Sequence, residues 1–187
     1  MKTPRVLCLL AEGFEEIEAL VPVDLLRRAN CEVVLAAIAE NREVMGRNGI
    51  VIKADALLSQ ISSLNERRQP EFDALLVPGG PGVSRLRKDG QATQLAAAYA
   101  QAKAWVAAIC AGPTVLLDAG LLKGRRFTAH FSVQEELPDA MGAERVVIDE
   151  NIITSRGAGT ALEFGLALVQ ALMGAQKREE IAQSIML

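Results

Sequence analysis

Cys110 lies in a context that is typical of a nucleophile at a sharp turn. The frame Ala108-Ile109-Cys110-Ala111-Gly112 follows an apolar run and precedes a helical pattern, with small residues two positions before and after the cysteine. A strand-to-helix turn of this kind brings those two positions into contact, so neither can be bulky, and it strains the backbone of the nucleophile. It also sets the sulfur at a helix N-terminus, where amides favour thiolate over thiol. The alternative interpretation is a cysteine that only fills space in the core.

Glu18 is the second candidate, because helical spacing puts it on a mostly apolar face. Three and four residues away it meets Phe14, Val21 and Pro22, besides Glu15. Desolvation there would raise the pKa of the Glu18 carboxyl. A neutral carboxyl could donate a hydrogen bond to a thiolate or exchange a proton with a substrate. The alternative is an ordinary acidic first turn of a helix.

Three further segments carry residue types with possible chemistry. Pro78-Gly79-Gly80-Pro81-Gly82 could bring backbone amides close to a ligand, as an oxyanion hole requires, or could be a tight turn. His130, the only histidine, is an acid–base candidate at the end of a predicted strand. Arg156 stands in a glycine-rich loop before a helix whose N-terminus could bind an anion; a solvated arginine is the alternative.

Cys8 and Cys31 lack such a context. Cys8 lies in the middle of an apolar run, where we expect a buried and inert thiol, and Cys31 lies in a connection where it could be exposed. An odd number of scattered cysteines fits reduced thiols in a cytosol better than a disulfide framework. One histidine and no CxxC motif argue against a zinc site.

Short apolar runs alternate with longer helical patterns, which predicts an α/β fold with a mostly parallel sheet and helices on both faces. In such sheets ligands bind beyond the carboxyl ends of the strands. A hairpin is expected over 44–52 at a sheet edge, and a capping box over 160–163 opens a long helix, which Gly174 ends. We predict strands over 6–11, 32–38, 73–77, 105–109, 127–130, 145–148 and 152–154, and helices over 15–29, 91–103, 114–119 and 160–173.

Composition limits the function classes. The 187 residues are half hydrophobic, enough for one sizeable core, and we expect a single domain over 1–187. Twenty Lys and Arg against 23 Asp and Glu give a net charge of −3, and aromatics are 4%, which argues against a nucleic-acid-binding protein and against disorder. The longest uncharged stretch, 104–117, is too short to cross a membrane, and the apolar run 6–11 is too short for a secretory signal. We therefore expect a soluble, cytoplasmic protein.

Together these motifs resemble the ThiJ/PfpI family of the class I glutamine amidotransferase-like superfamily. The nearest subgroup is that of the human parkinsonism-associated protein and bacterial YajL-like proteins. The glutamate and cysteine segments in combination make the resemblance specific. The matching segments run nearly end to end: 11–18, 22–24, 27–29, 77–80, 107–114, 154–157 and 159–160.

The resemblance implies a flavodoxin-like three-layer sandwich that forms a homodimer. It implies that a protonated Glu18 hydrogen-bonds the Cys110 sulfur, and that this sulfur oxidises readily to a sulfinate. The other site residues that it implies are oxyanion amides at Gly80 and Ala111, an imidazole at His130, and pocket residues Gly79, Arg28, Arg156 and Gly157.

Three positions depart from the pattern of the subgroup. Ala158 replaces a usual proline, and Phe131 replaces the proline that follows the histidine in human-type members. Asn48 replaces an arginine that would join Arg28 in an anion site.

The resemblance implies a cysteine-dependent enzyme that needs no cofactor and no metal. Its substrates would be methylglyoxal, glyoxal or their early adducts on proteins or nucleotides, as for a glyoxalase III or a deglycase. One alternative is an oxidative-stress sensor or redox-regulated chaperone that works through Cys110 oxidation without turnover. A second is a thiol hydrolase or peptidase, although no acidic residue is marked to orient His130. We expect no membrane partner and no specific nucleic-acid partner.

Overall fold

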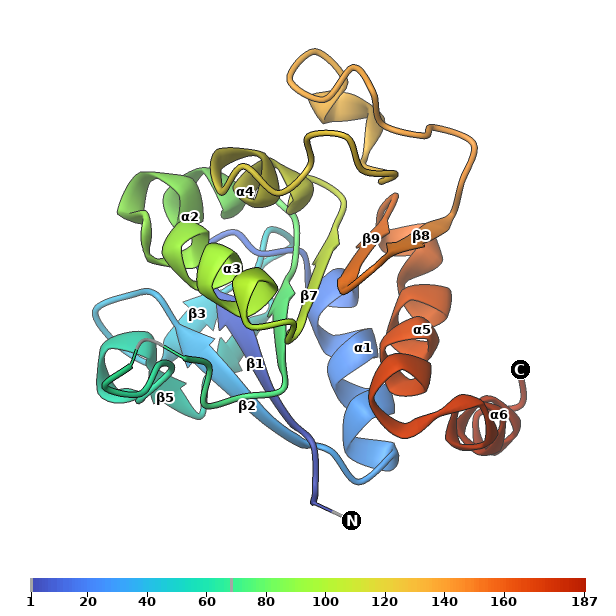
Figure 1. The fold of residues 1–187 in the computed structure, drawn as a ribbon. Coiled ribbons are helices and arrows are strands. Elements are labelled where there is room, and N and C mark those ends of the chain that lie inside the picture. The colour runs from blue at the N-terminus through green and yellow to red at the C-terminus, as the bar shows by residue number, and fades with distance from the viewer. Residues whose placement is uncertain (1, 68) are drawn as a thin grey trace.

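A seven-stranded sheet forms the centre of the computed structural model, which describes residues 2–67 and 69–187 (Figure 1). The strand order is β5-β2-β1-β6-β7-β9-β8, and the pairs are parallel except β8 with β9, which is antiparallel. This arrangement confirms the predicted mostly parallel sheet. The strands are β1 (Arg5–Leu10), β2 (Glu32–Ala37), β5 (Ala56–Leu57), β6 (Ala74–Val77), β7 (Trp105–Ile109), β8 (Val146–Asp149) and β9 (Ile152–Ser155).

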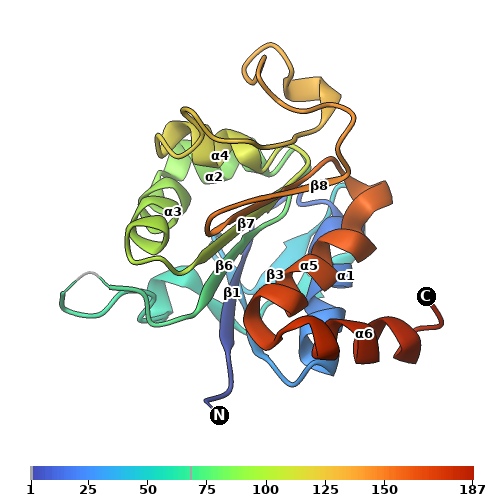
Figure 2. The same cartoon turned by 45° about the vertical axis from the view of Figure 1, so that its right-hand side comes forward.

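Helices cover both faces of the sheet, which gives the three layers of a flavodoxin-like fold (Figures 1 and 2). Helices α1 and α5 pack together on one face with α6 against α5, and α2, α3 and α4 pack on the other. The helices are α1 (Glu16–Arg28), α2 (Val83–Asp89), α3 (Gln91–Gln101), α4 (Pro113–Asp118), α5 (Ala161–Met173) and α6 (Ala175–Ser184).

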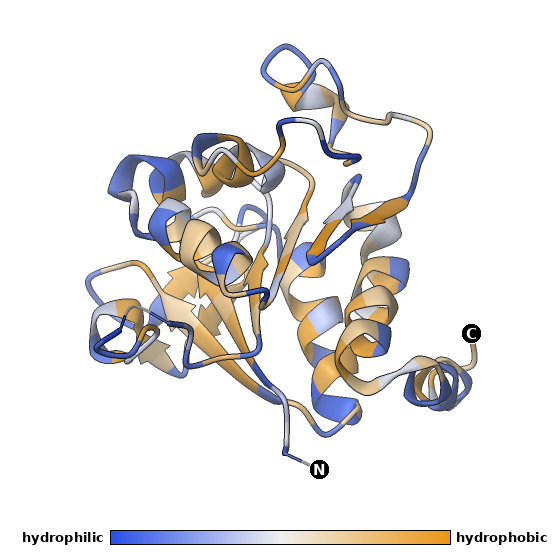
Figure 3. Ribbon diagram, in the orientation of Figure 1, coloured by the Kyte–Doolittle hydropathy of each residue, from blue (hydrophilic) through white to orange (hydrophobic). Residues whose placement is uncertain are grey.

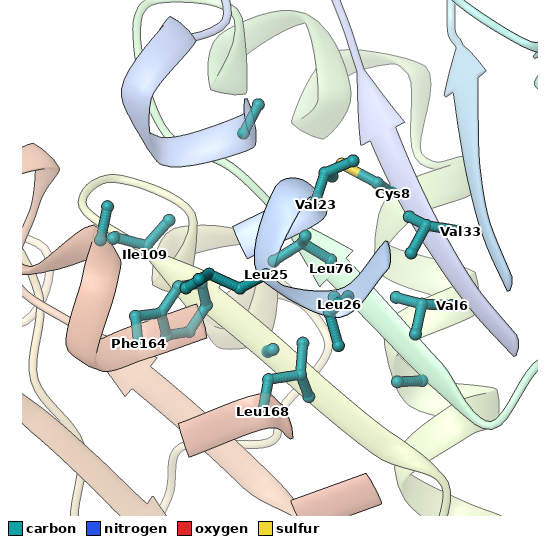
Figure 4. Close-up of a cluster of buried hydrophobic side chains, with 14 of the residues drawn as sticks. Val6, Cys8, Val23, Leu25, Leu26, Val33, Leu76, Ile109, Phe164 and Leu168 are labelled. Atoms are coloured by element: carbon teal, nitrogen blue, oxygen red, sulfur yellow. The ribbon is translucent and has the colours of Figure 1, made fainter. Parts of the chain in front are cut away.

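The sheet is buried on both faces, which explains why its strands read as continuous apolar runs. Along β1, Cys8 points into the core beneath α1 and α5, while its neighbours Leu7 and Leu9 point into the core beneath α2, α3 and α4. The strands are accordingly the most hydrophobic part of the ribbon (Figure 3). In the core beneath α1 and α5, Leu25 and Phe164 lie between the helices and the sheet (Figure 4).

Two local predictions in the C-terminal part of the chain are wrong. Residues 127–130 form no strand, because the backbone amides of Thr128 and His130 donate to the Thr154 side chain and the Cys110 carbonyl rather than to a strand ladder. The capping box over 160–163 is also absent, because the Thr160 hydroxyl is engaged with the Gly157 carbonyl and the Ser155 hydroxyl.

The predicted hairpin exists, but it does not extend the main sheet. Strands β3 (Glu43–Met45) and β4 (Val51–Lys53) form a separate antiparallel pair. Two backbone hydrogen bonds of 2.8 Å, from Gly13 to Met45 and from Arg47 to Phe14, attach the hairpin to the β1–α1 connection. The short elements α2 and β5 and the strongly polar α6 were not predicted.

Within residues 2–67 and 69–187, no helix is long and apolar enough to span a membrane.

Candidate active site

Cys110 occupies a strained turn between β7 and α4. Its φ of 65° lies in the left-handed region, which non-glycine residues rarely adopt and which costs of the order of 1–3 kcal/mol. The Cys110 amide donates to the Ser155 carbonyl at 2.9 Å, which fixes the turn against the end of β9. A Cβ on Gly112 would lie only 2.7 Å from the Val77 carbonyl oxygen. The small residue two positions after the cysteine is therefore required, as the elbow pattern predicts.

Glu18 reaches this turn from the first turn of α1. Its backbone amide donates to the Glu15 carboxylate at 2.8 Å, so Glu15 caps the helix and sets the orientation of Glu18. The Gly79 amide donates to Glu18 Oε2 at 3.0 Å. A Cβ on Gly79 would lie 2.5 Å from that oxygen and 2.6 Å from Cys110 Cβ. Only a glycine fits between the carboxyl and the cysteine.

Glu18 is 1% exposed, and burial raises the pKa of its carboxyl to about 7. The Cys110 thiol, the Gly79 amide and the Ala158 amide hydrogen-bond this carboxyl and oppose the shift, while the charge of Glu15 adds to it. The predicted increase in the pKa of Glu18 is thus present in the structure. At neutral pH the carboxyl is poised to accept or to release a proton.

The environment of the Cys110 thiol differs from the expected one. Burial, followed by the charge and hydrogen bond of Glu18, raises the pKa of Cys110 to about 12, although the amides of Gly80 and Ala111 lower it. The prediction that the helix end makes this thiol acidic is therefore wrong for a thiol beside an ionised Glu18. Burial and the neighbouring negative charge raise the pKa of Cys110 by more than the two amides lower it. When Glu18 holds the proton, that charge is gone and the same amides can stabilise a thiolate.

His130 is placed beside the cysteine by its backbone. Its amide donates to the Cys110 carbonyl at 3.0 Å, and its ring Nδ1 lies 2.8 Å from the Ser132 hydroxyl. Burial lowers the pKa of His130, and the charges of Arg47 and Arg156 lower it further, so the imidazole is neutral at pH 7. A Cβ on Gly157 would lie 3.2 Å from His130 Cδ2 and 3.8 Å from Glu18 Oε1. Gly157 therefore borders the space between the two side chains.

Arg156 lies near this group, whereas Arg28 does not. Arg156, Gly157 and His130 line one cavity of about 420 Å³. Arg28 lies ten residues after Glu18 on α1, roughly 15 Å along the helix axis, and its Nε donates to Asp24 at 2.7 Å. Asn48 donates from its backbone and side chain to the Glu16 carboxylate. Within one chain, the structure brings no anion site together from Arg28 and residue 48.

The other two cysteines are buried. Cys8 is fully buried, as predicted, and burial raises the pKa of its thiol far above the usual range. Cys31, in a connection where exposure was one possibility, is only 6% exposed because it packs in the core beneath α1 and α5, and burial raises its pKa to about 11. Among residues 2–67 and 69–187, no three His, Cys, Asp or Glu side chains are grouped to hold a metal ion.

Sequence reasoning missed two features of the site. Glu15 was not assigned a role, because glutamate is not among the residue types that usually cap a helix N-terminus, although its side chain does so here. The Ala158 amide also hydrogen-bonds Glu18, a contact between distant segments for which the sequence holds no local signal.

Residues 4–171 match the sequence model of the DJ-1/PfpI family. The chain belongs to the DJ-1/PfpI family. The solved structure of oxidised DJ-1 from Toxoplasma gondii is similar over 98% of both chains, with a TM-score of 0.89 and 34% identity. This likeness agrees with the three-layer fold.

Two curated relatives of similar sequence identity differ in how much of their own length the chain covers. The glutathione-independent glyoxalase DJR-1.2 of Caenorhabditis elegans is 33% identical over 94% of this chain and 92% of its own length. DJ-1 homolog A of Arabidopsis thaliana is 37% identical over 97% of this chain, but the match covers 46% of that protein. The chain thus spans about half the length of its plant relative.

Proposed function

We propose that this DJ-1/PfpI protein is a cofactor-independent glyoxalase that acts on small 2-oxoaldehydes such as methylglyoxal and glyoxal. The observation that carries the proposal is the contact between the Cys110 thiol and a Glu18 carboxyl whose pKa is about 7, beneath the amides of Gly80 and Ala111. The glyoxalase name of one relative agrees with it.

The first step uses one proton that the pair shares. Above pH 7 the pair holds a single proton, which resides on sulfur in one form and on Glu18 in the other. In the second form the thiolate attacks the aldehyde carbon, and a carbon–sulfur bond forms while the carbonyl electrons move to oxygen. The amides of Gly80 and Ala111 stabilise that oxyanion, which then takes the proton to give a hemithioacetal.

The second step is a proton transfer between adjacent carbons. Glu18, now ionised, removes the proton from the former aldehyde carbon and returns one to the neighbouring carbon. The first carbon is oxidised to a thioester and the second is reduced to an alcohol, so no external oxidant is needed. Water then cleaves the thioester, which releases lactate and restores the thiol. We assign His130 to the activation of that water, because it is neutral at pH 7.

Early adducts of methylglyoxal on proteins or nucleotides would be attacked by the same sulfur, so a deglycase activity is a finer form of this proposal. A peptidase is less well supported. His130 Nδ1 bonds a serine hydroxyl, and among the described residues no carboxylate hydrogen-bonds this ring. The alternative function, sensing of oxidative stress, would use oxidation of the same Cys110 sulfur and would need no turnover of a substrate.

The test is lactate formation from methylglyoxal by the wild-type protein, Cys110→Ser and Glu18→Ala. We expect activity only in the wild type. Equal rates in all three would end the proposal. A wild-type protein that forms no lactate, but gains two oxygens at Cys110 in mild peroxide with a change in client binding, would favour the sensor instead.

We further propose that the chain forms a homodimer. Four apolar side chains are about half exposed near the start of α1 and on the β3–β4 hairpin, which Asn48 ties to Glu16 of α1. They are Ile17, Met45, Ile50 and Val51. Clustered exposed apolar side chains of this kind mark interaction surfaces. Light scattering would give twice the chain mass for the wild type and less for Val51→Glu; a monomeric wild type would contradict the proposal.

A further inference from the structure

Phe131 exposes most of its aromatic ring, unlike every other phenylalanine of the chain. Its side chain is 80% exposed, whereas the other four phenylalanines are at most 4% exposed. It follows His130 directly, and the two ring centroids lie 4.1 Å apart with a tilt of 34°. A single exposed ring is not in itself a site. This ring, however, also lines a cavity.

His130 and Gly157 line the cavity of about 420 Å³, and a Cβ on Gly157 would lie 3.8 Å from Glu18 Oε1, so Gly157 borders both the cavity and the Glu18 carboxyl. Phe131 and Arg156 also line the cavity, together with residues of the loop that precedes α5. A methyl group would fill little of this volume, which is within the range of pockets that hold larger ligands. The cavity can therefore accept a substituent much larger than the methyl group of methylglyoxal.

The charge of the cavity is positive. Arg145 also lines it, but Glu163 is its ion-pair partner and the Gly159 carbonyl accepts a second hydrogen bond. Arg156 is exposed, and no described carboxylate lies within ion-pair distance of it. A ligand with a carboxylate could occupy the position that such a partner would take.

The position of the ring is fixed relative to the sulfur. The His130 amide bonds the carbonyl of Cys110 itself, so the chain runs from the nucleophile to Phe131 through one hydrogen bond and one peptide bond. Further along the chain, Glu136 forms an ion pair with Arg87 of α2, and Arg87 also pairs with Asp118 of α4. These ion pairs hold the turn over residues 131–136, which carries Phe131, against α2 and α4. This turn lies in the gold segment that rises above the strand ends in Figure 1.

We propose that this cavity is a subsite for a planar aromatic substituent that carries a negative charge, attached to the 2-oxoaldehyde that Cys110 attacks. Phe131 stacks on the ring and Arg156 pairs with the charge. The inference rests on the proposed glyoxalase function and deepens it: aryl 2-oxoaldehydes are preferred over methylglyoxal. Phenylglyoxal gives mandelate by the steps that convert methylglyoxal into lactate, with water as the only co-reactant.

The test is the ratio of kcat/KM for phenylglyoxal and 4-carboxyphenylglyoxal to kcat/KM for methylglyoxal. Initial rates are used, and intact mass verifies that no arginine adduct has formed. We expect Phe131→Ala to lower both ratios by about tenfold, the upper factor for aromatic pairing, and Phe131→Trp to preserve them. Arg156→Gln should lower only the carboxyphenyl ratio, by about two- to fivefold, as for an exposed ion pair.

The control is Ile148→Ala, which removes another exposed apolar side chain, from β8, and should leave the ratios as in the wild type. Unchanged ratios in Phe131→Ala would overturn the inference while methylglyoxal turnover kept the glyoxalase proposal intact. If methylglyoxal itself is not converted, the glyoxalase proposal fails. The subsite is then judged by whether mandelate slows alkylation of Cys110 in the wild type but not in Phe131→Ala; equal slowing, or none in either, would overturn it.

Discussion

Cys8 and Cys110 lie on or next to two strands of the same sheet, separated by β6, and have opposite surroundings. Cys8 lies within β1, with no exposure and apolar neighbours. Cys110 lies one residue beyond β7, where the chain turns with a φ of 65°. Burial raises the pKa of both thiols, but only Cys110 also has amides and a protonatable carboxyl against its sulfur.

The difference teaches that burial alone does not decide reactivity. Inside a strand, backbone amides are used by the neighbouring strands, so none is left for a thiolate. Beyond the carboxyl end of a parallel strand, the amides at the start of the next helix have no helical partner and can bind an anion. Glu18 adds a proton that can leave the sulfur without leaving the site.

The largest expected effect separates these two cysteines. Cys110→Ser should lower lactate formation by about 10⁴-fold or more, because it removes the nucleophile. Cys8→Ala should retain full activity per folded molecule and lower the free energy of unfolding by about 1 kcal/mol, since it opens a small void in the core. Steady-state assays and urea unfolding check both. Loss of activity in the folded Cys8→Ala protein would remove the distinction.

The second prediction sharpens the role of the carboxyl. Glu18→Gln should lower kcat by about 10²–10⁴-fold, the range for a positioned acid or base, because glutamine cannot exchange a proton. Glu16→Gln is the matched control: this residue is also buried on α1, but it bonds Asn48 rather than the cysteine. Similar losses in both variants would show that the charge of the helix end matters and not the proton of Glu18.

The third prediction concerns the space between the Glu18 carboxyl and Cys110. Gly79→Ala should lower kcat/KM by about 100-fold, because its Cβ would displace Glu18 Oε2 and Cys110 Cβ, and small misplacements of reacting groups cost about that factor. Circular dichroism should show a folded protein. Full activity in this variant would mean that the carboxyl and the cysteine need not touch.

The smallest effect is on stability. The pKa of Glu18 rises from about 4.5 to about 7 on folding, so the folded chain binds this proton more tightly. This contribution is fully present below pH 4.5 and is lost as pH rises to about 7, at a cost of the order of 1–3 kcal/mol. Glu18→Gln should therefore flatten the dependence of the free energy of unfolding on pH between 4.5 and 7. An unchanged slope would show that the carboxyl is not desolvated.

The sequence could predict what depends on local pattern. The parallel strands, the small residues around Cys110 and the apolar face of Glu18 follow from periodicity and from the sterics of a turn. Residues 127–130 were mistaken for a strand, because an extended segment that bonds a side chain and a single carbonyl has the same pattern as a paired strand. The high pKa of Cys110 could not be predicted, because it depends on how deeply a distant glutamate and the sulfur are buried together.

The most direct test of the shared proton is the pH dependence of Cys110 alkylation by iodoacetamide, followed by intact mass. In the wild type, the rate should rise through an inflection near pH 7, where the pair loses its first proton, and Glu18→Gln should lose that inflection. If wild type and Glu18→Gln give the same profile, the sulfur and the carboxyl do not share a proton, and the account is wrong.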